Sequence, residues 1–207
     1  FLDEFPEFSR AALETLRQPL EEREVTVSRV EASVTYPANF QLVAAMNPCP
    51  CGHFPDRSRC RCTDGQITRY LQKVSGPMLD RIDICVEASP ITYGDIRSSG
   101  NNESSREIRA RVEQARKIQR ERFAGENIRC NGEMSGRHIR KFCWLGREEE
   151  KFMEEIFKKL ALSARMHDRI LKVARTTADL AEEEKIRLAD LCEAVSYVKS
   201  RDKFWGN

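Results

Sequence analysis

The chain has 207 residues, which is enough for one large domain or for a domain with a smaller partner. Its 35 lysines and arginines nearly balance its 33 aspartates and glutamates, so a strong global attraction to nucleic acid is excluded and any such contact must come from local charge. No apolar run reaches the roughly 18 residues of a membrane span, and no signal-peptide pattern is present. With eight cysteines and no secretion signal, the chain is expected to be a soluble, cytoplasmic protein without membrane contact.

The first part of the chain alternates between strand and helix patterns. Residues 40–46 are nearly all apolar, so they predict a strand buried on both faces. Pro19 is expected to end a helix that Ser9 caps. In chain order the predicted elements are a strand end at 1–4, a helix over 10–18, a hairpin with strands 24–28 and 31–36, a strand over 40–46, a Cys-rich loop over 49–65, a short helix over 66–73 and a strand over 82–88.

The second part, after a polar linker over 94–105, contains only helical patterns. The predicted helices cover residues 106–123, 136–143, 147–160, 164–180 and 184–200. Ser135 and Ser163 are expected to cap two of them. Strands alternating with helices and then helices alone predict an α/β domain over 1–128, followed by an all-α domain over 129–207.

Two carboxylates stand side by side at the end of the first predicted strand, Asp3 and Glu4. A strand that delivers one carboxylate to a nucleotide-bound Mg²⁺, and a second to the attacking water, is a Walker B site. The alternative for these residues alone is an acidic turn at a strand end. Asn47, at the end of the strand predicted over 40–46, offers an amide that could hold a water against a terminal phosphate, or a cap for the turn at Pro48.

Three arginines lie at positions where a phosphate contact competes with a structural role. Arg81 precedes a predicted strand, where it could pair with Asp80 or Asp83 or act as an arginine finger in a neighbouring subunit. Arg165 opens a helix, where a cation is unfavourable with the helix dipole, so it is either a surface residue or a phosphate ligand. Arg29 occupies the hairpin tip, a plausible point for nucleic-acid contact.

Two Cys-x-Cys pairs follow the strand predicted over 40–46, formed by Cys49 with Cys51 and by Cys60 with Cys62. Four thiolates could close a tetrahedral Zn²⁺ site in a loop too polar to fold alone. The spacing is shorter than the usual Cys-x₂₋₄-Cys, and four free thiols are the alternative.

Five segments in this order resemble the magnesium-chelatase-like AAA+ ATPases of the ComM/YifB family, over essentially the whole chain. They are Phe-Leu-Asp-Glu-Phe-Pro-Glu-Phe (1–8), Leu-Arg-Gln-Pro-Leu-Glu (16–21), Ala-Met-Asn-Pro-Cys-Pro-Cys-Gly (45–52), Ser-Gly-Pro-Met-Leu-Asp-Arg-Ile-Asp (75–83) and Ser-Ala-Arg-Met-His-Asp-Arg-Ile-Leu-Lys-Val-Ala-Arg-Thr-Thr-Ala-Asp-Leu (163–180).

The resemblance implies a role for each candidate residue. Asp3 matches the Walker B ligand of Mg²⁺ and Glu4 the catalytic base, while Asn47 matches the sensor 1 residue. Arg81 matches an arginine finger that acts in trans. Arg165 matches the sensor 2 arginine, with Arg169 as a weaker candidate, and Arg29 would face a central pore.

The resemblance also implies an activity and partners. The ComM branch is associated with hexameric rings that use ATP and Mg²⁺ to drive DNA branch migration during natural transformation, so branched or single-stranded DNA is the expected partner. One alternative is a magnesium chelatase subunit that uses ATP while Mg²⁺ is inserted into a porphyrin. The other is a zinc-bearing interaction module without enzymatic activity.

No Gly-x-x-x-x-Gly-Lys-Ser/Thr phosphate loop occurs in the chain, and the chain does not begin with Met. We therefore expect the carboxyl-terminal half of an ATPase: a partial αβα core that lacks the phosphate-loop strand, followed by a helical lid domain. Such a fragment is expected to be inactive by itself. Without that strand, residues 40–46 and 82–88 would expose apolar edges, which predicts self-association or a rearranged sheet.

Overall fold

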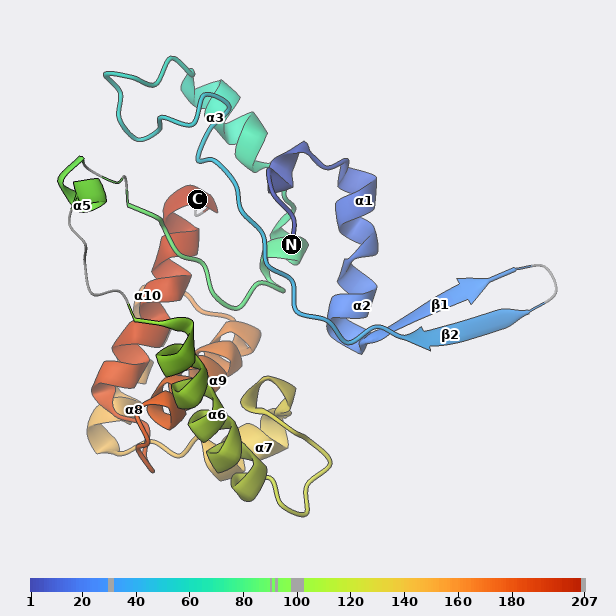
Figure 1. Ribbon diagram of the computed structural model, residues 1–207, viewed down its shortest axis with the longest axis vertical. Helices are drawn as coiled ribbons and strands as arrows, with labels where there is room; N and C mark the ends of the chain where they lie inside the picture. Colours follow the sequence, from blue (N-terminus) through green and yellow to red (C-terminus); the bar gives the residue numbers. More distant parts are fainter. Residues whose placement is uncertain (30–31, 90, 92, 98–102, 206–207) are drawn as a thin grey trace. The chain divides into compact units, whose positions relative to one another are not determined.

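The computed structural model describes the chain except for residues 30–31, 90, 92, 98–102 and 206–207. It divides into two compact units (Figure 1). Unit 1 comprises Phe1–Ile84 with Arg201–Asn207, and unit 2 comprises Cys85–Ser200. The units therefore do not divide at the predicted residue 128, because helix α6 (Ser105–Arg122) packs against helix α9 (Ala164–Leu180) in unit 2.

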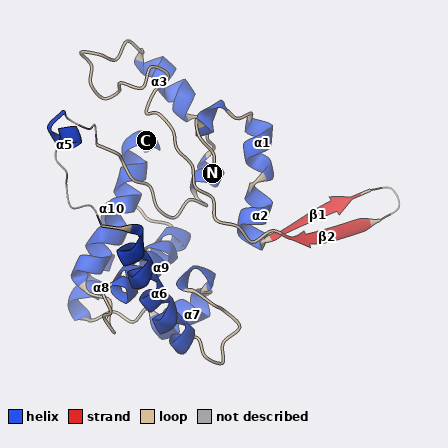
Figure 2. Ribbon diagram, in the orientation of Figure 1, coloured by secondary structure: helices blue, strands red, loops and turns tan. Residues whose placement is uncertain are grey.

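Unit 1 combines short helices with one small sheet (Figure 2). A buried cluster of Phe5, Leu13, Val74, Met78 and Leu79 forms its centre. Its elements are the 3-10 helix η1 (Phe5–Glu7), α1 (Arg10–Thr15), α2 (Arg17–Glu22), β1 (Glu24–Ser28), β2 (Ser33–Pro37), α3 (Asp64–Leu71) and α4 (Gly76–Leu79).

The helix predicted over 10–18 is two helices, α1 and α2, which meet at Leu16. Pro19 was predicted to end a helix, and this prediction is wrong. The residue lies in the first turn of α2. A missing N–H costs nothing there, because the first turn has no intrahelical acceptor for it. Helix α2 ends instead at Arg23, whose backbone is left-handed with φ 61°.

The predicted hairpin is confirmed as an antiparallel pair, β1 with β2 (Figure 1). Hydroxyls face each other across one side, in the pairs Thr26–Thr35 and Ser28–Ser33. The opposite side carries Val25, Val27, Val34 and Tyr36, and the last three of these are exposed. The hairpin therefore contributes little to the core of unit 1.

The strands predicted over 40–46 and 82–88 are not formed. Residues 40–46 are extended, and their one ladder contact is an isolated parallel bridge between Ala44 and Leu2. Residues 82–88 have no regular secondary structure. Neither segment is part of a sheet among the described residues, so the expected burial is also wrong: Phe40 is 44% exposed and Val86 is 69% exposed. The described part of unit 1 thus has only the two-stranded sheet, which is compatible with a partial αβα core.

Unit 2 is helical, as predicted. Its largest core cluster draws on α7, α8, α9 and α10, and includes Met153, Ile170, Leu191 and Val195. The elements not yet introduced are α5 (Tyr93–Arg97), the 3-10 helix η2 (Asn131–Glu133), α7 (Gly136–Phe142), α8 (Arg147–Lys159) and α10 (Leu188–Trp205), the end of which belongs to unit 1. None of the helices in the described residues is long and apolar enough to cross a membrane.

Helix α10 begins four residues later than the predicted position 184 because of local polar contacts. Asp190 accepts a hydrogen bond from the Arg187 N–H at 2.8 Å, which caps the helix start. The preceding carbonyls of Glu183 and Glu184 accept hydrogen bonds from the Arg175 guanidinium, at 2.5 and 2.7 Å. These contacts hold residues 183–187 as a loop.

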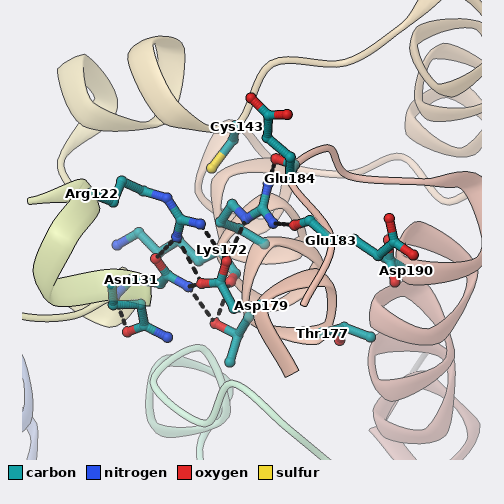
Figure 3. Close-up of polar contacts among 12 residues, drawn as sticks. Arg122, Asn131, Cys143, Lys172, Thr177, Asp179, Glu183, Glu184 and Asp190 are labelled. Atoms are coloured by element: carbon teal, nitrogen blue, oxygen red, sulfur yellow. Dashed lines mark hydrogen bonds and ion pairs between the residues drawn. The ribbon is translucent and has the colours of Figure 1, made fainter. Parts of the chain in front are cut away.

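A buried ionic network ties the helices of unit 2 together (Figure 3). The fully buried Asp179 carboxylate pairs with Arg122 of α6 and accepts a hydrogen bond from the Asn131 amide at 2.7 Å. Arg175 Nε donates to the same carboxylate at 3.1 Å. Burial is the main cause that lowers the pKa of Arg175, and the Asp179 charge opposes it. One carboxylate thus joins α6, η2 and α9, and Arg175 links this network to the loop before α10.

We predict that Asp179→Ala destabilises unit 2 by about 3–5 kcal/mol, because it leaves two arginines without their buried counter-charge. Denaturant unfolding followed by circular dichroism would measure the change. Asp168→Ala on the same helix is the matched control, since Asp168 is 44% exposed at its side chain and should cost little. Equal stability of the two variants would contradict this account of the fold.

Candidate functional site

Main-chain hydrogen bonds place the acidic pair beside Asn47. The Leu2 N–H donates to the Val43 carbonyl, and the Ala45 N–H donates back to the Leu2 carbonyl, both at 2.9 Å. The Phe5 N–H donates to the Ala45 carbonyl at 3.0 Å. The two segments therefore run parallel, and the residues that follow them meet at the same end. Asp3, Glu4 and Asn47 are brought together in this way.

The backbone at the acidic pair is in an unusual conformation. Glu4 has φ 50° and ψ 45°, in the left-handed region, and its N–H donates to Asp3 Oδ1 at 2.9 Å. For a residue other than glycine this conformation costs roughly 1–2 kcal/mol. Such strain is concentrated at functional sites. Within the described part of the chain neither carboxylate forms an ion pair, and both are exposed. Exposed carboxylate oxygens are the ligand type that Mg²⁺ prefers.

Asn47 is exposed. The loop after it folds back, so that a Cβ built on Gly52 would lie 3.6 Å from Asn47 Oδ1. Tyr70 of α3 is buried, and burial is the main cause that raises its pKa, with the Glu7 charge as the next cause. The side chain is therefore a neutral phenol at physiological pH.

Arg81 is held within unit 1. Its guanidinium forms an ion pair with Glu21 and donates to the Pro77 carbonyl at 2.6 Å, and its side chain is only 11% exposed. Of the two partners that the sequence left open, Asp80 pairs instead with Arg201 at 3.3 Å. Acting in trans would require Arg81 to leave Glu21.

The other two candidate arginines are exposed. Arg165 lies in the first turn of α9, in unit 2, whereas Asp3, Glu4 and Asn47 belong to unit 1. Arg169, the weaker alternative, is buried at 8% exposure. Arg29 follows β1, and its backbone pairs with Ala32 to close the hairpin. The side chain of Arg29 has no ion pair with any other described residue.

The four cysteines predicted as metal ligands gather in one cluster. Their Sγ atoms all lie within 4.8 Å of one another. Cys49 Sγ lies 3.4 Å from that of Cys51 and 3.8 Å from that of Cys60, and the Cys51–Cys60 separation is 3.6 Å. With Zn–S bonds of about 2.3 Å, a tetrahedral site requires sulfur separations of roughly 3.8 Å. The cluster thus has the dimensions of a tetrahedral metal site.

Backbone amides support the cluster from outside. The Phe54 N–H donates to Cys49 Sγ at 3.4 Å. Hydrogen bonds from the backbone of His53 and then of Arg61 lower the pKa of Cys51 to about 6. Burial raises the pKa of Cys62 to about 11 and also raises that of Cys60. Amides aimed at sulfur are the outer contacts that stabilise thiolate ligands.

Two residues of this region have no distinguishing signal in the sequence. Tyr70 lies on the apolar side of α3 with Ile67 and Leu71, so its pattern is that of a core position. Glu21 is one of several glutamates near the end of α2. Only the fold shows that Tyr70 is buried in a cluster with Cys49 and that Glu21 pairs with Arg81.

Comparison with known proteins identifies a family for both parts of the chain. Residues 1–96 match the family model described as "Magnesium chelatase, subunit ChlI", and residues 102–198 match that of its C-terminal part. Together these matches cover most of the chain and place it among the magnesium-chelatase-like proteins.

The chain is 44% identical over 198 residues to the competence protein ComM of Haemophilus influenzae, and 44% identical over 199 residues to the protein YifB of Escherichia coli. Each alignment covers 95% of this chain and 38% of the relative. The chain belongs to the ComM/YifB family and spans less than two fifths of the length of these relatives.

Proposed function

We propose that this chain supplies the water-activating and phosphate-sensing residues of a Mg²⁺-dependent ATPase that remodels DNA. The observation that supports it best is the convergence of Asp3, Glu4 and Asn47 at the end of one parallel pair of segments. Family membership supports the ATPase class. The action on DNA is the finer part of the proposal, for which the name of one relative, a competence protein, is an indication.

Each residue has one task in this mechanism. When bound, Mg²⁺ neutralises charge on the phosphates of ATP, and Asp3 would hold it. Glu4 takes a proton from the attacking water, and Asn47 orients that water toward the terminal phosphate. Arg81 of a neighbouring subunit, and Arg165, stabilise negative charge that develops in the transition state.

The proposed DNA contact is the hairpin tip. Arg29 is exposed there and has no described ion-pair partner, so it can meet a phosphate without losing an existing contact. In a hexameric ring, six such tips would face a central pore and follow a threaded strand or duplex. Branch migration during natural transformation is the activity that we assign to this ring.

In a full-length protein that contains this chain and a phosphate loop, Glu4→Gln should lower ATP turnover by about 100-fold or more, because the proton acceptor is lost. Glu155→Gln is the matched control, since Glu155 is an exposed glutamate of α8. The measurement is phosphate release with branched DNA, without DNA, and with a porphyrin. Turnover that responds to porphyrin and not to DNA would favour the chelatase function instead.

In the same assay Arg29→Ala should weaken stimulation by DNA several-fold and reduce the salt dependence of DNA binding by about one counterion. Arg116→Ala, at an exposed position of α6, is the control. A variant that keeps full DNA stimulation would exclude the hairpin tip as the contact.

The chain alone has no phosphate loop and should show neither turnover nor micromolar binding of ATP in a calorimetric titration.

We also propose that the cysteine cluster holds one structural Zn²⁺. Four thiolates at tetrahedral spacing, with backbone amides behind them, are typical of closed zinc sites. Cys49 is fully buried and packs with Ile67, Tyr70 and Leu71, so the metal would fasten the loop to α3.

Elemental analysis of the purified chain should find one zinc per molecule. Cys51→Ser should release the metal and expose residues 49–62 to proteolysis, because the loop has little other support. Cys192→Ser, which removes an exposed thiol of α10, should retain the metal. A chain that carries no metal when purified and binds none on zinc addition would contradict the proposal.

The exposed apolar segments 40–46 and 82–88 support one further expectation, that the chain by itself self-associates. Light scattering that finds only monomers at high concentration would exclude it.

A further inference from the structure

We infer that the groove between α7, α8 and α9 in unit 2 binds single-stranded DNA, with Trp144 and Phe157 stacked on bases and nearby cations in contact with phosphates. This contact is distinct from the hairpin tip of unit 1. It rests on the proposed function only in that DNA is the partner, and it does not depend on ATP turnover.

The groove has the size of a ligand site. Helices α7, α8 and α9, with the loop that joins the first two, surround a space of about 1050 Å³ (Figure 1). Ligand sites in proteins commonly measure roughly 300–1,000 Å³. Each helix contributes a buried apolar side chain to its lining, namely Ile139, Met153 and Leu171. The groove is therefore concave and has an apolar base.

Two large aromatic side chains line this groove and remain exposed. Trp144, in the loop between α7 and α8, is 60% exposed, and Phe157 of α8 is 39% exposed. Lys185 Nζ lies 5.4 Å from the centre of the Trp144 ring, so one cation already lies over this indole. A single exposed aromatic residue needs no explanation. Two in one groove form a surface on which bases can stack, because every base has a flat π-face.

The charges that line the groove favour an anionic occupant. Two of the lining acids are already engaged, since Glu154 pairs with Lys158 at 2.6 Å and Asp168 lies 3.2 Å from the His167 ring. Among the described lining residues Glu150 is the one acid outside these pairs. Three lining cations are exposed and form no ion pair with any residue that the structure describes: Arg140, Arg147 and Lys151. Positive charge is thus in excess.

The aromatic rings and the cations together identify the occupant. In a duplex the bases are stacked inside, so they cannot reach Trp144, whereas a single strand exposes them. An acidic peptide would neutralise the cations but has no use for flat aromatic faces. Single-stranded DNA uses both, with its bases on the rings and its phosphates on the cations. Such segments occur in the branched DNA proposed as the partner.

The test measures binding of a fluorescein-labelled oligo(dT) to the 207-residue chain by fluorescence anisotropy. Trp144→Ala and Trp144→Leu should each weaken binding about tenfold, because neither keeps an aromatic ring, whereas Trp144→Phe should stay within about threefold of the parent. Melting temperatures should match the parent, since Trp144 is exposed. Unlabelled oligo(dT) should quench tryptophan fluorescence, and Trp144→Phe should remove most of that quenching.

A second set of variants tests the phosphate contacts. Lys151→Ala should reduce the slope of the logarithm of affinity against that of salt concentration by about 0.7, as expected for one phosphate of a single strand. Lys159→Ala is the matched control on the same helix, because Lys159 is exposed but does not line the groove. An equal change in both variants would overturn the phosphate contact.

Arg29→Ala in the same assay separates the groove from the hairpin tip. If Trp144→Ala weakens binding and Arg29→Ala does not, the hairpin proposal fails and the groove stands. If Arg29→Ala weakens binding and Trp144→Ala does not, the inference about the groove fails. Full binding by Trp144→Leu, or quenching by polyglutamate and not by oligo(dT), would make the groove a surface for a protein partner and overturn the inference.

Discussion

The candidate site depends on three main-chain hydrogen bonds between the first residues of the chain and residues 43 to 45. These bonds make two segments parallel, and parallel segments end on the same side, which is why Asp3 and Glu4 meet Asn47. The arrangement needs no regular strand at either segment. Beyond the last bond, the left-handed backbone of Glu4 turns the chain at the acidic pair.

Unit 2 reaches its rigidity by other means. Its helices are joined by a buried carboxylate, Asp179, which is shared by two arginines and an amide, and they pack around an apolar core. A buried ion pair of this kind adds little net stability relative to apolar residues, but it tolerates few arrangements of its partners. Such a property would suit the role proposed for Arg165, which requires a fixed position on α9. Leaving any residue of this network unpaired would cost free energy, and this cost favours the observed arrangement of the helices.

The hairpin and the longer helices of unit 2 could be predicted from the sequence, whereas most strands could not. The helix predicted over 10–18 is two helices, and α5 lies in the segment predicted to be a linker. Periodic apolar positions and caps such as Ser163 act locally, so α8 and α9 lie close to where their patterns place them. A strand depends on neighbouring strands that its own pattern does not identify. Residues 40–46 have the composition of a buried strand, but they pair only with the first residues of the chain, and Phe40 and Val43 are exposed. The cysteine cluster was predictable as a set, whereas the contacts of Tyr70 and Glu21 depend on tertiary folding alone.

The ion pair between Arg81 and Glu21 affects how the proposed ATPase site would become active. In unit 1 the guanidinium is largely buried against Glu21 and the Pro77 carbonyl, so it is not poised to reach a phosphate. Separating Arg81 from Glu21 would lose a charge-assisted hydrogen bond worth about 1.5–3 kcal/mol of free energy. A nucleotide bound to a second subunit would have to replace that bond with a bidentate contact between its phosphate and the guanidinium. The proposed catalytic residues would then come together only after two subunits have associated. A ring built in this way would hydrolyse ATP only where two neighbours are correctly docked, which couples turnover to assembly.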